Sequence, residues 1–360
     1  MPNENLTRAK EAQNDEFYTQ FEDIEKEINA YLEYDPDVFR GKSILLPCDD
    51  PEWSNFTKYF VLNFEYFGLK KLISTCFAMD SAKPIQPTKF ISQPSQFNAE
   101  KSNSNGKILV LERKGDNQSD IRVENLQWDY LEGDGDFRSQ EISALRNEAD
   151  IIITNPPFSL FREFLAWIVE ANKRFLIIGN MNAVTYKEVF PLIKGNKMWY
   201  GCSISSGDRE FGVPEEYPLE AAGWRIDEKG NKYIRVKGVR WFTNLDHGRR
   251  HLPLPLMTKA DNLKFSRHSD LREKHAYVQY DNYYAIEVPY TETIPSDHDG
   301  VMGVPISFLD KYCPEQFELM GITEKGNDLS WLIIPGNDKY DRPYICGKRM
   351  YARLLIRKKQ

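Results

Sequence analysis

The chain of 360 residues has room for two ordinary domains, or for one α/β core with a sizeable extension. Hydrophobic residues make up 41% of it, and no apolar run approaches the roughly eighteen residues of a membrane-spanning helix, which argues against a membrane protein. The formal net charge of −7 argues, taken alone, against a nucleic-acid partner, because binding to phosphates requires positive potential.

The first residues of the chain contain no apolar stretch that could serve as a secretory signal, so we expect a cytoplasmic protein. The five cysteines stand at positions 48, 76, 202, 313 and 346. None of them forms a Cys-x-x-Cys pair, so we expect buried free thiols and no metal site.

Short apolar, β-branched runs bounded by turn residues predict buried strands along the first half of the chain. These runs are 43–47, 71–77, 107–111, 150–154 and 174–179. Amphipathic segments at 54–67 and 160–171 fall between them and predict helices. The alternation predicts an α/β fold with a doubly wound, mostly parallel sheet, in which ligands bind at the carboxyl ends of the strands.

Two punctuated segments divide the chain. Residues 81–106 are rich in Ser, Pro, Gln and Asn without an apolar period, which predicts a flexible surface insert. A second punctuated segment, residues 247–263, follows the strand-like run 239–243 and marks the expected domain boundary. We therefore expect a first domain over residues 1–245 and a second region over residues 246–360.

The basic charge is concentrated late in the chain. Between Lys229 and Lys274 there are twelve Lys and Arg against four acids, and the stretch from Tyr344 to Gln360 carries six against none. Such clusters are most often solvated faces, but they are also the electrostatic footprint of a nucleic-acid-binding surface. The clustering of basic residues therefore weakens the argument from net charge against a nucleic-acid partner.

The motif Asn155-Pro156-Pro157-Phe158 directly follows the predicted strand 150–154. An amino group conjugated with an adenine ring is a weak nucleophile, so an enzyme that methylates it must position it and offset the charge that develops. The side-chain oxygen of Asn155 and the backbone carbonyl of Pro156 can accept its two hydrogens, and the prolines fix the path of the backbone. Phe158 offers a flat face for a base that has been flipped out of a duplex.

At this point the sequence resembles the EcoRI-type adenine-specific DNA methyltransferase family. The resemblance covers most of the chain and is carried by seven blocks, at 14–20, 47–56, 133–139, 155–158, 175–180, 299–305 and 347–353. It implies a methyltransferase core that uses S-adenosylmethionine and methylates N6 of adenine. Asn at position 155 agrees with this, since related N4-cytosine enzymes usually have Ser there.

The resemblance also implies a set of cofactor-binding residues. They are Phe17, Tyr18, Thr19, Pro47, Cys48, Asp49, Asp50, Ser54, Asp136, Phe137 and Asn155. For three of these groups a structural alternative stays open. Thr19 could begin a capped helix over residues 21–28, Asp49 and Asp50 could cap the next helix, and Asp136 could belong to a plain turn.

This sequence departs from the wider pattern of such enzymes in two places. No glycine lies between Gly41 and Gly68, so the first cofactor loop is not Gly-rich. The acid that usually ends the second strand and holds the ribose is replaced by Cys76 and Phe77. The ribose contact therefore stays unassigned.

The order of the blocks places DNA recognition late. Too few residues separate Cys48 from Asn155 for a recognition domain, so we expect double-stranded DNA to be read by residues 246–360. The candidates for phosphate or base contacts are Arg249, Arg250, Lys348, Arg349 and Arg353. Alternatively, the apolar residues between 350 and 356 could make the carboxyl-terminal segment an edge strand or a helix packed on the core.

Two other functions share this chemistry. Protein glutamine methyltransferases also resemble Asn-Pro-Pro-aromatic, but they usually have a Gly-rich cofactor loop, and RNA adenine methylation is opposed only by the resemblance. If the enzyme is a DNA methyltransferase that protects a specific site, a restriction endonuclease that acts separately is a possible partner. The sequence specificity and the oligomeric state are not predicted.

Overall fold

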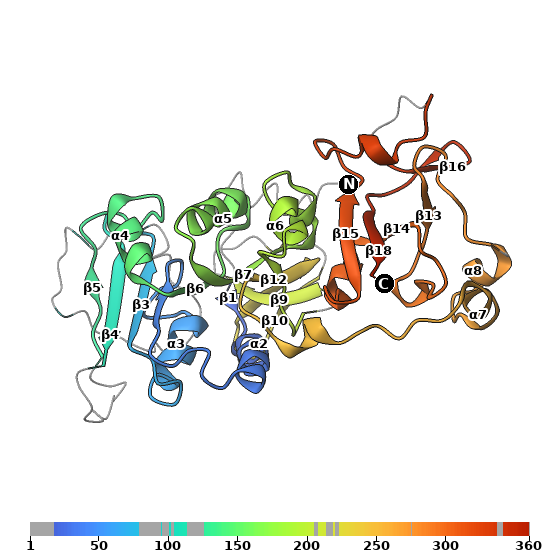
Figure 1. Ribbon diagram of the computed structural model, residues 1–360. Helices are drawn as coiled ribbons and strands as arrows, with labels where there is room; N and C mark the ends of the chain where they lie inside the picture. The colour runs from blue at the N-terminus through green and yellow to red at the C-terminus, as the bar shows by residue number, and fades with distance from the viewer. Residues whose placement is uncertain are drawn as a thin grey trace. The chain divides into compact units, whose positions relative to one another are not determined.

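The computed structural model describes residues 18–78, 95, 101, 104–113, 126–204, 208–213, 219, 223–274, 276–336 and 341–359. They form two compact units, the first from Met1–Asn180 and Gly201–Asp246 and the second from Met181–Tyr200 and His247–Gln360 (Figure 1). The division differs from the expected boundary at residue 246 because Met181–Tyr200 joins the second unit. Most of the expected insert 81–106 lies outside the described residues. Within the described ranges, no helix is long and apolar enough to cross a membrane.

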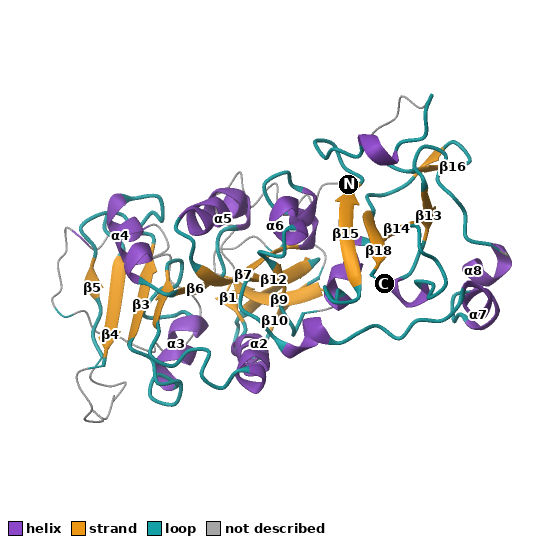
Figure 2. Ribbon diagram, viewed as in Figure 1, coloured by secondary structure: helices purple, strands orange, loops and turns teal. Residues whose placement is uncertain are grey.

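The first unit alternates strands and helices (Figure 2). Its helices are α2 (Phe21–Tyr34), α3 (Asn55–Leu62), α4 (Gln140–Glu148), η4 (Phe158–Leu160) and α5 (Phe161–Glu170). Its strands are β1 (Tyr18–Thr19), β2 (Ser43–Leu46), β3 (Lys71–Cys76), β4 (Lys107–Glu112), β5 (Asp129–Tyr130), β6 (Ile151–Thr154), β7 (Arg174–Asn180), β9 (Asp208–Val213), β10 (Trp224–Ile226), β11 (Lys232–Lys237) and β12 (Val239–Thr243). Each strand and helix expected from the sequence is present, within a few residues of its expected ends except at the longer α2 and the shorter α3.

The large sheet of this unit has the strand order β5-β4-β3-β2-β6-β7-β12. Its centre is parallel, since β2 pairs in this way with β3 and β6, and β6 with β7. The outer pairs β3–β4, β4–β5 and β7–β12 are antiparallel. The α/β class is therefore confirmed, but the sheet is mixed rather than mostly parallel, because an apolar run predicts a strand without its direction.

Helices lie on both sides of this sheet, with α4 and α5 on one side and α2 and α3 on the other (Figure 1). The central strands are buried on both faces, and Ile151, Ile152 and Ile153 of β6 have no exposed surface. A parallel strand covered in this way needs a continuous apolar run, which is the pattern of 150–154. The carboxyl ends of β2, β3 and β6 consequently meet at one edge of a rigid core.

A second sheet in the same unit has the order β1-β9-β11-β10, and all its pairs are antiparallel. Side chains alternate between the two faces of a strand. Phe211 and Val213 of β9 and Ile234 and Val236 of β11 point to one face and join the hydrophobic core of the unit. The short strand β1 is thereby held against the core.

The second unit contains helices and strands from Met181–Tyr200 and from the carboxyl-terminal region. Its helices are η5 (Met181–Thr185), α6 (Phe190–Lys194), η6 (Gly248–His251), α7 (Lys259–Phe265), α8 (Ser269–Lys274), η7 (Thr291–Thr293), η8 (Ile306–Lys311) and η9 (Ser330–Leu332). Its strands are β8 (Trp199–Tyr200), β13 (Ala285–Glu287), β14 (Val301–Val304), β15 (Phe317–Ile322), β16 (Tyr344–Ile345), β17 (Lys348–Arg349) and β18 (Leu354–Lys358).

The carboxyl-terminal segment is part of the core of the second unit. The strand order there is β13-β14-β18-β15, so β18 pairs on both of its edges. Leu354, Leu355 and Ile356 have no exposed surface. The segment is thus a packed strand, as the structural alternative expected, but β18 is a central strand and not an edge strand.

Candidate active site

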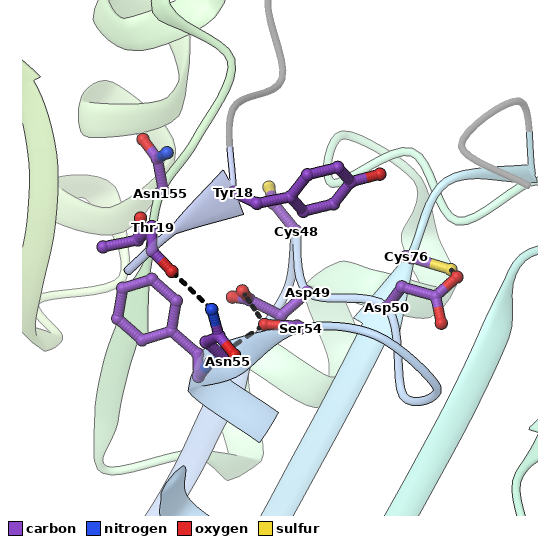
Figure 3. Close-up of a pocket in the computed structure, with 10 residues that line it drawn as sticks. Tyr18, Thr19, Cys48, Asp49, Asp50, Ser54, Asn55, Cys76 and Asn155 are labelled. Carbon is purple, nitrogen blue, oxygen red and sulfur yellow. Dashed lines mark hydrogen bonds between the residues drawn. The ribbon is translucent and has the colours of Figure 1, made fainter. Parts of the chain in front are cut away.

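A pocket opens at the carboxyl ends of β2, β3 and β6, where an α/β sheet is expected to bind its ligand (Figure 3). The residues that line it come from β1, from the loop after β2, from the start of α3 and from the ends of β3 and β6. They are Tyr18, Thr19, Cys48, Asp49, Asp50, Ser54, Asn55, Phe56, Cys76 and Asn155. Seven of them belong to the expected cofactor set, which the chain brings together from three distant blocks.

Strand β1 presents Tyr18 and Thr19 to the pocket. The backbone carbonyl of Thr19 accepts a hydrogen bond of 2.8 Å from Asn55 Nδ2, which ties β1 to the start of α3. The side-chain hydroxyl of Thr19 is buried and has no hydrogen-bond partner within the described residues. The helix-capping alternative for Thr19 is wrong, since the N-cap of α2 is Gln20. Phe17 lies outside the described residues.

Asp49 lies at the centre of the pocket floor (Figure 3). Its Oδ1 accepts a hydrogen bond from Ser54 Oγ and its Oδ2 accepts one from Thr154 Oγ1, both at 2.6 Å. Burial raises the pKa of this carboxyl to about 7, against the opposing effect of the two hydroxyl donors. Asp49 thus joins the loop after β2 to the last residue of β6, directly before Asn155.

Asp50 belongs to a buried ion cluster at the side of the pocket. Its Oδ2 lies 2.9 Å from Lys107 Nζ, which also contacts Glu52 Oε2 at 2.5 Å. The thiol of Cys76 donates to the same Asp50 oxygen at 3.5 Å. Removing one charge of such a buried set leaves the others uncompensated, at about 3–5 kcal/mol.

The helix-capping alternative for Asp49 and Asp50 is also wrong. The cap of α3 is Ser54, whose hydroxyl accepts hydrogen bonds from the backbone amides of Phe56 and Thr57 at 3.0 and 3.5 Å. Because Ser54 caps α3 and also donates to Asp49, it fixes the carboxylate relative to the helix. The two partners, Asp49 and Ser54, stand five residues apart in the sequence block 47–56.

The Asn-Pro-Pro-Phe motif forms the turn between β6 and α5. Asn155 lines the pocket, whereas Pro156 is buried and Phe158 begins η4. The Phe158 ring packs edge-on against Phe211 of β9, with 6.4 Å between ring centroids and an angle of 86°. Of the four expected catalytic residues, Asn155 alone is among those that line the pocket, and Pro156, Pro157 and Phe158 follow it along the turn.

The block 133–137 packs on the end of β3 through Gly135. A Cβ at Gly135, whose φ is +85°, would come within 2.3 Å of the carbonyl oxygen of Cys76, so only glycine fits there. The side chains of Asp136 and Phe137 in this block do not line the pocket. Phe137 packs between Phe164 and Trp167, with centroid distances of 5.0 and 5.7 Å.

Asp136 is held by its own turn. It accepts from the backbone amide of Arg138 at 2.8 Å and pairs with the Arg138 guanidinium at 2.6 Å, which lowers the pKa of its carboxyl. Neither Asp136 nor Phe137 lines the pocket. Pro47 also stands apart as a buried residue at the end of β2.

The expected DNA-binding residues of the second unit divide by exposure. Lys348 and Arg349 are exposed on β17, where Arg349 pairs with Asp341 at 2.6 Å, and Arg249 lines a separate groove with residues 252–257. Arg250 is buried, with its guanidinium 3.6 Å from the Trp199 ring centroid.

Arg353 is a buried partner of Glu287. The two side chains are 12% and 5% exposed, and Arg353 Nη2 lies 2.7 Å from Glu287 Oε1. The structure therefore places Arg250 and Arg353 inside the second unit instead of on a surface open to phosphates. Both were chosen from charge alone, and charge in a sequence does not reveal burial.

Sequence reasoning gave no role to Asn55, Phe56 and Cys76, which also line the pocket. The position of Asn55 and Phe56 directly after the cap Ser54, at the carboxyl edge of the sheet, is the signal that could have placed them in the pocket. Cys76 stands where an acid was expected, and the structure brings Asp50 beside it from the loop after β2. Among the described residues, no group of three or more His, Cys, Asp or Glu could hold a metal ion.

The whole chain matches proteins of one family. The family described as adenine-specific methyltransferase EcoRI matches residues 5–359. The type II methyltransferase M.EcoRI of Escherichia coli is 44% identical over 97% of this chain and 98% of its own length. The type II methyltransferase M.MpnI of Mycoplasma pneumoniae is 34% identical over 99% of this chain and 98% of its own. No solved structure matches the chain. The expected resemblance is thereby confirmed, and the chain belongs to the EcoRI family of adenine-specific methyltransferases.

Proposed function

We propose that this enzyme transfers a methyl group from S-adenosylmethionine to the N6 amino group of an adenine flipped out of double-stranded DNA. The observation that carries the proposal is the hydrogen bond from Thr154 to Asp49, which holds the Asn155 turn at the edge of the pocket. A donor bound in the pocket and a base held by that turn would therefore meet. The family supports adenine as the target base.

The residues of the pocket fit the proposed methyl donor. When bound, S-adenosylmethionine supplies a methyl group on a positively charged sulfur. Its amino group is a cation that the Asp49 carboxylate would hold, and such a partner would offset the burial that raises the pKa of Asp49. The unpartnered Thr19 hydroxyl offers a further hydrogen bond, and Tyr18 and Phe56 offer aromatic faces.

The turn after β6 would position the adenine. The Asn155 side-chain oxygen and the Pro156 carbonyl would each accept one N6 hydrogen, which keeps the nitrogen lone pair directed at the methyl group. The bond from nitrogen to the methyl carbon forms as the bond from carbon to sulfur breaks, and the amino group then releases one proton. The face of Phe158 would stack on the base, and its perpendicular contact with Phe211 would hold the ring in place.

The relatives suggest the biological setting. M.EcoRI and M.MpnI are named type II methyltransferases, so we propose that this chain modifies a specific DNA sequence, with a separate endonuclease as its possible counterpart. The protein glutamine and RNA adenine alternatives are not favoured by these relatives. A cytoplasmic location agrees with a DNA substrate.

The test uses the purified full-length chain with isotope-labelled S-adenosylmethionine and plasmid DNA, structured RNA or a host-cell protein extract. We expect label in DNA alone, and N6-methyladenine in the nucleoside digest. Methylome sequencing of cells that express the gene would then identify the site. Label in cytosine, in RNA or in protein would contradict the proposal.

A further inference from the structure

Strands β9, β10 and β11 extend the first unit away from the pocket, and their outer face is not used by the proposed reaction. The register gives one row of cross-strand neighbours, Tyr18, Gly212, Tyr233 and Arg225, one from each strand of the sheet. Because Tyr18 lines the pocket, this row begins at the site. With strands about 4.8 Å apart, it spans roughly 14 Å, or about four base-pair steps of 3.4 Å.

The outer face carries basic side chains. Arg235 and Lys237 alternate with the buried Ile234 and Val236, so both point outward with Tyr233, and both are exposed. Within the described part of the chain neither makes an ion pair. Residues 223–237 contain five Lys and Arg against two acids, Asp227 and Glu228.

Two of the acids near this face, Asp227 and Glu210, are already engaged. Asp227 accepts hydrogen bonds from the backbone amides of Lys229 and Asn231, both at 2.9 Å, and so closes the turn between β10 and β11. Glu210 pairs with Arg225 at 2.5 Å, and the Arg225 guanidinium lies 4.2 Å from the Tyr233 ring centroid. The ribbon is thus ordered before any partner binds, and its free charge is positive.

The edge strand β10 also exposes apolar side chains. Trp224 and Ile226 are each 49% exposed, although they lie on the same face as the buried Ile234. This part of the ribbon therefore projects beyond the hydrophobic core. Trp224 and Ile226 lie on the face opposite Arg235 and Lys237, so the ribbon offers apolar side chains on one face and free cations on the other. A two-stranded ribbon of this kind fits the major groove.

We infer that the β10–β11 ribbon, residues 224–237, binds the DNA backbone next to the flipped adenine. The inference rests on the proposed function, since the duplex on either side of a base in the pocket must lie within a few nucleotides of it. The row from Tyr18 to Arg225 covers that distance with a basic, ordered surface. DNA contacts were expected only after residue 246, and this surface belongs instead to the catalytic unit.

The first test replaces Arg235 and Lys237 by alanine together. We expect weaker binding to a labelled duplex and a slope of log K against log salt that is smaller by about two units, one for each lost phosphate contact. Binding of S-adenosylmethionine should be unchanged. The matched control is Lys70→Ala with Arg174→Ala, two exposed cations at the amino ends of β3 and β7, which should leave affinity and slope as in wild type.

A second measurement does not depend on the stability of a variant. A benzophenone amino acid at position 233, on the same face as Arg235 and Lys237, should crosslink to a duplex on irradiation, and the same group at position 70 should not. Unchanged affinity and slope in the double variant, or a crosslink that is absent at position 233, would overturn the inference while wild type still methylates DNA. Failure of wild type to methylate DNA at all would instead overturn the proposed function.

Discussion

Thr154 Oγ1 donates a hydrogen bond of 2.6 Å to Asp49 Oδ2, across two adjacent parallel strands and 105 residues of sequence. Both side chains are buried, and Thr154 directly precedes Asn155. This contact makes the floor of the pocket and the Asn-Pro-Pro-Phe turn one rigid piece. The geometry that we propose for methyl transfer would thus be built into the edge of the sheet before any ligand binds.

The variant Thr154→Val keeps the β-branched shape of the side chain and removes the donor. It leaves a buried carboxylate with one hydrogen bond fewer, so we expect a loss of unfolding free energy of about 1–3 kcal/mol at pH 8. The rate of methyl transfer should fall more than the affinity for S-adenosylmethionine. Urea denaturation and steady-state kinetics measure the two effects.

Thr75→Val is the matched control for this variant. Thr75 lies one residue before the end of β3, and its buried hydroxyl donates to the Pro47 carbonyl at 3.3 Å. Thr75 contacts Asp49 only through its backbone carbonyl, which accepts from the Asp49 amide at 2.8 Å and is kept in the variant. We expect its effect to be confined to stability. A Thr154→Val enzyme as stable and as fast as wild type would contradict the positioning role of the contact.

The pKa of Asp49 predicts a pH dependence of stability. Folding raises it from 3.8 to about 7, so the folded chain binds more protons than the unfolded chain between these values. The stabilising contribution of this group is complete below pH 4 and is lost as the pH rises through 7. Asp49→Asn removes the titration. Relative to wild type, it should gain on the order of 2 kcal/mol of unfolding free energy between pH 5.5 and 8.

Chemical denaturation of both proteins across this pH range checks the sign. Parallel stability curves for wild type and Asp49→Asn would show that Asp49 titrates normally. The same variant should bind S-adenosylmethionine more weakly at pH 8, because a neutral amide cannot pair with the ammonium group. Equal cofactor affinity would remove Asp49 from the proposed binding set.

The positions of these residues could be predicted in part because parallel strands bring their carboxyl ends to one edge. Apolar runs located β2, β3 and β6, and the polar residues that follow them had to meet there. An apolar run does not encode strand direction, so the antiparallel orientation of β4 and β12 was not predicted. The link between Thr154 and Asp49 depends on atomic register, which no spacing in the sequence reveals.

The roles of single aromatic and basic residues were harder to predict. Phe137 packs into the core beside Phe164, because a ring next to a Gly-rich turn can cover either a ligand or a helix. Arg353 pairs with Glu287, which lies 66 residues away in the sequence. Such pairs arise from tertiary packing, so charge and motif alone do not separate a buried partner from a surface contact.

Asn155 should be essential for the chemical step. Asn155→Ala removes the proposed acceptor for one N6 hydrogen, and we expect methyl transfer to fall by at least about 10²-fold, the loss seen when one preorganised hydrogen-bonding group is removed. Equilibrium dialysis should show near-normal binding of S-adenosylmethionine. Asn155→Asp should keep some activity because a carboxylate still accepts the hydrogen, and an alanine variant with a tenth of wild-type activity would refute the role.

Phe158 is expected to stack on the flipped base. Phe158→Leu keeps an apolar contact with Phe211 but loses the flat face, so transition-state stabilisation should fall by about 1–3 kcal/mol, whereas Phe158→Tyr should be mild. A duplex with 2-aminopurine at the target position reports flipping separately. Its fluorescence should rise on binding wild type and less with Phe158→Leu, and no rise with wild type would count against flipping.

The last prediction separates structural arginines from DNA contacts in the second unit. Arg353→Met leaves the buried Glu287 carboxylate without its cation, so the unfolding free energy of this unit should fall by about 3–5 kcal/mol. Arg353→Met with Glu287→Met removes both charges and should recover most of that loss. Its DNA binding should then show the wild-type salt slope, because neither side chain is available to phosphates.

If the exposed strand β17 contacts the DNA backbone, Lys348→Ala should show the opposite pattern. It should leave stability unchanged and lower the salt slope by about one unit, equally for all sequences. Denaturation curves and salt titrations of the three variants therefore distinguish burial from contact. An Arg353→Met protein with wild-type stability and a reduced salt slope would return Arg353 to the DNA-binding surface and would show that the buried pair does not hold in solution.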